Sequence, residues 1–224
     1  MGPGFSELNP YYCMFSADNS GAYDEVLLYR AYSLSQGVVT QMQAQFQKNA
    51  GGSGWTRGMV ASFLMRNGLP IYAAGSGYDP AWEDQGVTAT LQGRDSRIQI
   101  FTKTDHSIIT YGLDGNSPAE YRMGWMFGGE DLTCCPTGWA VKKGQAYNYA
   151  QAQGNLQSTT GSIIFRAAEA LLNYMEACVE KNGNVDGTAA GYWAALRNRA
   201  KVDADYNKTV AVSYTHLRAH ETVL

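Results

Sequence analysis

The sequence predicts a mainly α-helical fold with long loops and one small β-hairpin. Two consecutive stretches of helical periodicity occupy the C-terminal third, and glycine- and aromatic-rich stretches separate the periodic segments. Near the middle of the chain, a short region of alternating apolar residues is typical of paired strands. At 224 residues, the chain is long enough for one large domain or two small ones.

The first half is predicted to contain a strand and a helix. The apolar run in residues 25–33 ("EVLLYRAYS") favours an extended segment. After a glycine-rich loop, residues 56–68 ("TRGMVASFLMRNG") place four apolar side chains on one helical face. Thr56 is positioned to cap this helix and Gly68 to end it.

The middle of the chain is predicted to form the β-hairpin, over residues 97–111 ("RIQIFTKTDHSIITY"). Ile98 and Ile100 alternate in the first arm, and Ile108 and Thr110 alternate in the second. His106 falls in the turn between them, where it is expected to be an ordinary polar turn residue.

The C-terminal third is predicted to form two helices joined by a short loop. Residues 162–183 carry a continuous apolar stripe that ends at Gly183, a typical helix terminator. Thr188 is positioned to cap the second helix, over residues 189–202. The stripe of the first helix comprises Ile164, Ala168, Leu171, Leu172, Met175, Cys178 and Val179, and the inward residues of the second are Trp193, Leu196 and Ala200.

Composition excludes several classes of function. A formal net charge of −3 gives no basis for binding nucleic acid, and no run of about 18 apolar residues could span a membrane. The four cysteines are too few for a disulfide framework in a chain of this length, so buried thiols are expected. A bridge from Cys13 to Cys134 or Cys135 stays open.

Catalysis is weakly indicated. Carboxylates are paired at residues 24–25, 83–84 and 130–131, so a secreted or periplasmic glycan-active hydrolase is the alternative from another functional class. Adjacent carboxylates rarely face one site, and motifs for a nucleophile elbow or a phosphate-binding loop are absent from the sequence. We therefore expect a protein that is not an enzyme and needs no cofactor.

Four aromatic residues are the candidate ligand-binding groups. Trp55, Tyr78, Trp82 and Trp125 lie in glycine-rich loops rather than on periodic faces. Aromatic rings stack on the C–H faces of sugars, while polar loop groups bond the hydroxyls. The alternative is that these rings close over the core of their own domain.

Five blocks of the sequence resemble, in order, motifs of the SusD/RagB family of outer-membrane nutrient-binding lipoproteins. The blocks are "MVASFLMRNGLPI" (59–71), "GRDSRIQI" (93–100), "TGWAVKK" (137–143), "SIIFRAAEALLNYMEACVEKNG" (162–183) and "ALRNRA" (195–200). The resemblance implies a lipid-anchored protein on the outer leaflet that captures glycans for a SusC-like TonB-dependent transporter. It also implies a structural motif in which Arg94, Asp95 and Arg97 form an ion-pair cluster to which Arg166 and Glu169 tie a helix.

The ends of the chain carry a separate expectation. The family's signal peptide, lipidated cysteine, preceding helical region and closing segment have no counterpart here, so residues 1–211 are expected to be a partial SusD/RagB-like domain. Residues 212–222 resemble a translated transposon-end sequencing adapter, and 212–224 are expected to be a non-biological tail. His216 and His220 have the spacing of a metal site on a helix, but on this interpretation the spacing is accidental and no metal is expected.

Overall fold

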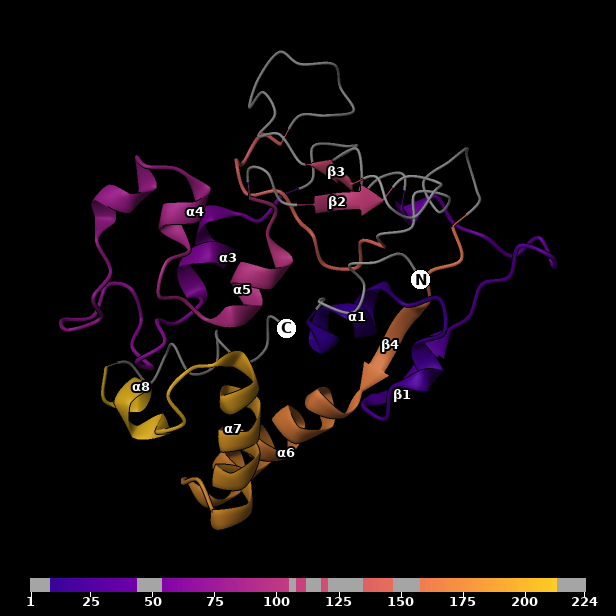
Figure 1. The fold of residues 1–224 in the computed structure, drawn as a ribbon. Helices are drawn as coiled ribbons and strands as arrows, with labels where there is room; N and C mark the ends of the chain where they lie inside the picture. Colours follow the sequence, from indigo (N-terminus) through magenta and orange to yellow (C-terminus); the bar gives the residue numbers. More distant parts are fainter. Residues whose placement is uncertain are drawn as a thin grey trace. The chain divides into compact units, whose positions relative to one another are not determined.

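The computed structural model describes residues 9–43, 54–104, 108–111, 118–120, 135–146 and 158–212. The chain divides into two compact units (Figure 1). The first unit comprises Met1–Thr56 and Ile100–Phe165, and the second comprises Arg57–Gln99 and Arg166–Leu224. The mainly α prediction is confirmed, with several differences in the individual elements.

The first unit contains α1 (Pro10–Ser16), the 3-10 helix η2 (Ser20–Ala22) and four short strands. Strand β1 (Val26–Arg30) pairs with β4 (Ser162–Arg166), whose last residue begins the second unit, and β2 (Ile108–Tyr111) pairs with β3 (Pro118–Glu120) in antiparallel register. The predicted strand within residues 25–33 is confirmed by β1. An aromatic cluster centred on Tyr12 and Phe101 forms the core of this unit.

The second unit contains α3 (Arg57–Ser62), the 3-10 helix η4 (Pro80–Glu83) and four α-helices. These are α4 (Val87–Thr90), α6 (Ala167–Asn182), α7 (Gly187–Ala200) and α8 (Tyr206–Val212). Helices α6 and α7 pack side by side (orange to yellow in Figure 1) around Met175, Cys178, Ala189 and Trp193, which confirms the predicted helical hairpin. Gly183 ends α6 with a φ of 72°, a conformation that glycine adopts without steric cost.

The helix predicted at residues 56–68 is shorter than expected. Helix α3 ends at Ser62, and Met65 instead pairs through its backbone with Arg94 in an isolated antiparallel bridge. Gly68 lies in the turn after this bridge, with a φ of 84°. Tertiary partners therefore compete with the helix for the backbone of residues 63–66.

The predicted hairpin at residues 97–111 is wrong in its first arm. Residues Ser96–Phe101 form helix α5, and β2 pairs with β3, further along the chain. The carboxylate of Asp95 accepts a hydrogen bond from the backbone N–H of Arg97 at 2.8 Å, which caps the start of the helix. Ile98 is completely buried.

Two further boundaries are corrected. Residues 162–166 form β4 instead of the first turns of the long helix, and Ile164 is 52% exposed rather than part of the apolar stripe. β-branched and aromatic residues favour this strand. Asp186 caps α7, because its side chain accepts a hydrogen bond from the N–H of Ala189 at 2.7 Å, so the prediction that Thr188 is the cap is wrong.

Cys13, Cys135 and Cys178 are free thiols, so Cys13 forms no disulfide. Within the described ranges, no helix has the length and apolarity required to cross a membrane. The same ranges contain no cluster of three or more histidine, cysteine, aspartate or glutamate residues suited to a metal ion. His106, Cys134, His216, His220 and residues 213–224 of the expected tail lie outside the described residues.

Candidate functional site

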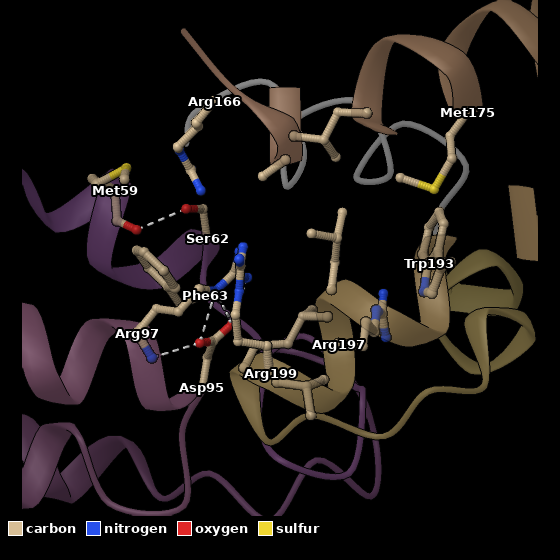
Figure 2. Close-up of a pocket in the computed structure, with 16 residues that line it drawn as sticks. Met59, Ser62, Phe63, Asp95, Arg97, Arg166, Met175, Trp193, Arg197 and Arg199 are labelled. Carbon is tan, nitrogen blue, oxygen red and sulfur yellow. Dashed lines mark hydrogen bonds and ion pairs between the residues drawn. The ribbon is translucent and has the colours of Figure 1, made fainter. Parts of the chain in front are cut away.

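A cavity of about 50 Å³ lies within the second unit (Figure 2). Its walls come from α3, the segment leading into α5, and the helical hairpin α6–α7. One side is apolar, with Leu172, Met175 and Trp193 among the lining residues, and the other is charged. The charged residues in the lining are Asp95, Arg97, Arg166, Arg197 and Arg199.

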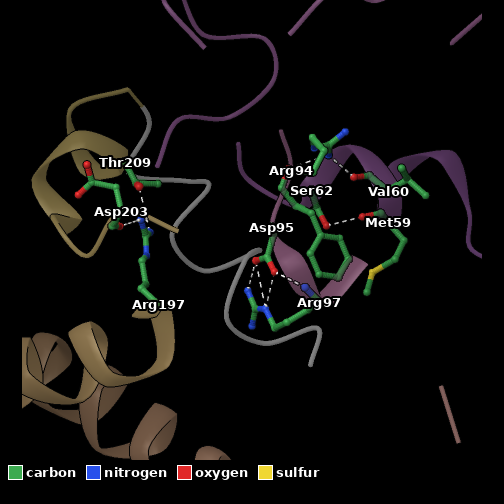
Figure 3. A network of polar contacts seen from close by, with 10 residues as sticks. Met59, Val60, Ser62, Arg94, Asp95, Arg97, Arg197, Asp203 and Thr209 are labelled. Atoms are coloured by element: carbon green, nitrogen blue, oxygen red, sulfur yellow. Dashed lines mark hydrogen bonds and ion pairs between the residues drawn. The ribbon is translucent and has the colours of Figure 1, made fainter. Parts of the chain in front are cut away.

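Asp95 is the buried anion of the expected ion-pair cluster. It is completely buried, and its carboxylate receives Nε and Nη2 of Arg97, the latter at 2.6 Å (Figure 3). The backbone N–H of Asp95 donates to the carbonyl of Leu64 at 2.9 Å, which anchors the start of α5 to the segment after α3. A carboxylate with both oxygens bonded in this way is satisfied without water.

Arg94 does not join this ion pair through any printed contact but binds the end of α3. Its Nη2 donates to the carbonyls of Val60 at 2.6 Å and Phe63 at 2.8 Å (Figure 3). Carbonyls at a helix C-terminus lack partners within the helix, and a cation there also interacts favourably with the helix dipole. The side chain is completely buried, and burial lowers the pKa of its guanidinium.

The helical hairpin meets this cluster through arginines rather than through Glu169. Arg166 is buried and lines the same cavity as Asp95 and Arg97, whereas Glu169 is exposed and does not line it. Arg197 donates to the hydroxyl of Thr209 at 2.9 Å and to the carbonyl of Asp203 at 3.3 Å (Figure 3). Sequence reasoning missed Arg197, although its place one turn beyond Trp193 on the inward face of α7 was a usable signal.

Two of the four candidate aromatic residues pack together in the second unit. The rings of Tyr78 and Trp82 meet edge to face, with centroids 5.5 Å apart and planes at 85°. The 3-10 helix η4 presents Trp82, and Asp79 caps it by accepting from the N–H of Ala81 at 2.9 Å. Both rings are half-buried, so each is partly accessible to a ligand.

Polar groups surround this aromatic pair. The Tyr78 hydroxyl donates to Glu83 at 3.3 Å, and the same carboxylate forms an ion pair with Arg57 at 2.8 Å. Beneath it, the guanidinium of Arg94 lies 5.4 Å from the centroid of the Tyr78 ring. Burial, and then the negative charge of Glu83, raise the pKa of Tyr78, so its hydroxyl keeps its proton at neutral pH. The arrangement therefore offers apolar ring surface beside charged hydrogen-bonding groups, as sugar recognition requires.

The other candidate aromatics are not part of this group. Trp55 belongs to the first unit, where it packs against the cluster of Tyr12 and Phe101, and Trp125 lies outside the described residues. Of the paired carboxylates, Glu83 is bound to Arg57 and Tyr78, and residues 130–131 are not described.

Comparison with known proteins gives the family. The sequence model described as the SusD family matches residues 24–215, which is most of the chain. The chain belongs to the SusD family. All five blocks that resemble SusD/RagB motifs fall inside this match. A comparison with curated protein sequences gives no match.

Solved SusD-like structures share the fold. A SusD-like protein from Bacteroides fragilis is 20% identical over 90% of this chain and 43% of its own, with a TM-score of 0.56. The selenomethionine form of a protein named BT4246 is 18% identical over 91% of this chain and 40% of its own, with a TM-score of 0.53. The chain therefore spans less than half the length of the solved structures that it matches.

Proposed function

We propose that this SusD-family protein binds a glycan nutrient and delivers it to a transporter without breaking any bond. Membership of the SusD family carries this proposal, because proteins of the family are binding components of nutrient uptake. Tyr78 and Trp82 are the proposed contacts for sugar rings, and Glu83 and Arg57 are the proposed partners for hydroxyl groups. Trp55 and Trp125 stay candidates for further contacts.

The proposed partner is a SusC-like TonB-dependent transporter, and the proposed location is the outer leaflet of the outer membrane. A lipid anchor on the complete protein would hold it there. These proposals rest on the family and concern the complete protein.

The experiment is a binding titration of the purified chain with a panel of oligosaccharides, followed by calorimetry. Saturable binding without products is expected. Trp82→Ala and Tyr78→Ala are each expected to weaken binding about tenfold, because one lost stacking contact is worth about 1 kcal/mol or slightly more. The matched control is Tyr174→Ala, since Tyr174 is an exposed aromatic residue on α6 of the same unit.

Two results would count against the proposal. Release of shortened oligosaccharides by the chain, and its loss on replacing a carboxylate, would favour the hydrolase alternative. Saturable binding that is unchanged in both aromatic variants would instead place the ligand away from Tyr78 and Trp82.

A further inference from the structure

We propose that the cavity of the second unit is a binding site for a carboxylate group. This site is separate from the aromatic pair, and its occupant need not be the transported nutrient. Four guanidinium groups and one carboxylate line the cavity, so its walls carry an excess of positive charge. Charges removed from water are stable only when opposite charges lie close to them, and a bound anion would bring the walls nearer to neutrality.

Two of the arginines have structural contacts within the second unit. Arg97 binds Asp95 through two nitrogens of its side chain. Arg197 donates to Thr209 and stands 4.8 Å from the centroid of the Trp193 ring. These contacts make one side of the cavity rigid.

Arg166 and Arg199 are the proposed anion-binding groups. Arg166 stands where β4 passes into α6, and only 8% of its surface is exposed. Arg199 comes from the last turn of α7. Figure 2 shows the side chains of both residues extending into the cavity, near Asp95 and Arg97. A guanidinium presents planar, parallel N–H donors that match the two oxygens of a carboxylate, and this geometry holds whatever else each arginine contacts.

The size and the apolar wall of the cavity select the anion. A volume of about 50 Å³ has room for roughly three to five water molecules, which corresponds to a carboxylate with one or two attached carbons. Leu172, Met175 and Leu196 would face the hydrocarbon part of such a ligand. Since apolar walls exclude water, they also strengthen the attraction between the guanidinium and carboxylate groups. A free small carboxylate and the glutamate side chain of an acidic peptide both have this chemistry.

The test compares thermal unfolding of the full chain in sodium acetate and in sodium chloride at equal ionic strength. Acetate is expected to raise the unfolding midpoint in a saturable manner, because a ligand that binds only the folded state stabilises it. Arg166→Met and Arg199→Met are each expected to remove this rise. Arg66→Met removes the same charge from an exposed position in the same unit, and is expected to leave it intact.

A tetraglutamate peptide distinguishes the two sources of the carboxylate. A rise in midpoint at far lower concentrations of peptide than of acetate identifies an acidic peptide, and a rise with acetate alone identifies a small carboxylate. Equal midpoints in acetate and chloride, with no effect of the peptide, overturn the proposal. So does a rise with acetate that persists in both cavity variants.

A second measurement on the unaltered protein covers the case in which the variants fail to fold. Broadening of the NMR line of ¹³C-labelled acetate is expected to saturate as acetate is added to a fixed amount of protein. Broadening that never saturates shows nonspecific contact and overturns the proposal.

Discussion

Replacing Arg94 with methionine is expected to reduce the free energy of unfolding by about 3 kcal/mol. The guanidinium of Arg94 is completely buried and donates to the carbonyls of Val60 and Phe63. Hydrogen bonds that involve a charged group contribute about 1.5–3 kcal/mol each, and methionine can replace neither. The carbonyl of Val60 keeps a turn bond from the N–H of Phe63, so the loss is smaller than two full bonds.

Urea unfolding followed by tryptophan fluorescence measures this change. For a chain of this length, 3 kcal/mol corresponds to a fall of about 6–12 °C in the thermal midpoint. Arg66→Met is the matched control, because Arg66 is exposed and its replacement is expected to change stability by less than about 0.5 kcal/mol. A loss of stability in Arg94→Met no larger than in Arg66→Met would refute the claim that Arg94 holds the end of α3.

Three further predictions concern single positions. Burial lowers the pKa of Lys103 to about 7, so between about pH 7 and its ordinary pKa of about 10.4 the unfolded chain binds more protons and stability rises with pH, by up to about 1.4 kcal/mol per unit; Lys103→Met is expected to remove this part of the slope, and parallel urea-derived curves would contradict it. Asp186→Ala, which removes the cap of α7, is expected to lower the thermal midpoint by about 2–4 °C, and an equal fall in Thr188→Ala would show that Asp186 is not the cap. Gly68→Ala is expected to cost at least about 1 kcal/mol in urea unfolding, because its φ is 84°, whereas Gly58→Ala in α3, where an added Cβ meets nothing within 4 Å, is expected to be neutral or stabilising.

The candidate site was predictable in its residue types and only partly in its grouping. Loop position and chemistry singled out Tyr78 and Trp82, which do pack together. The same criteria singled out Trp55, which packs in the aromatic cluster of the first unit. Whether a loop aromatic meets a ligand or its own core depends on contacts far away in the sequence, and no local pattern reports those contacts.

The arginine motif shows the same division between neighbours and distant partners. The Asp95–Arg97 ion pair joins residues two apart, and the expectation of a cluster there is confirmed. Arg94 was expected in that cluster, but its printed hydrogen bonds go to carbonyls up to 34 residues away. Glu169 was expected to tie α6 to the cluster, yet it is exposed, and Arg166 reaches the shared cavity instead.

By itself, the sequence determined the helical hairpin and the strand at β1. Their apolar periodicities are local, and a terminating glycine acts through its own backbone conformation. Only the tertiary structure decided that residues 96–101 form a helix, that residues 162–166 form a strand and that α3 ends at Ser62. In each of these short segments the local preference is worth a fraction of a kcal/mol per residue, so a capping carboxylate, a partner strand or a buried guanidinium outweighs it.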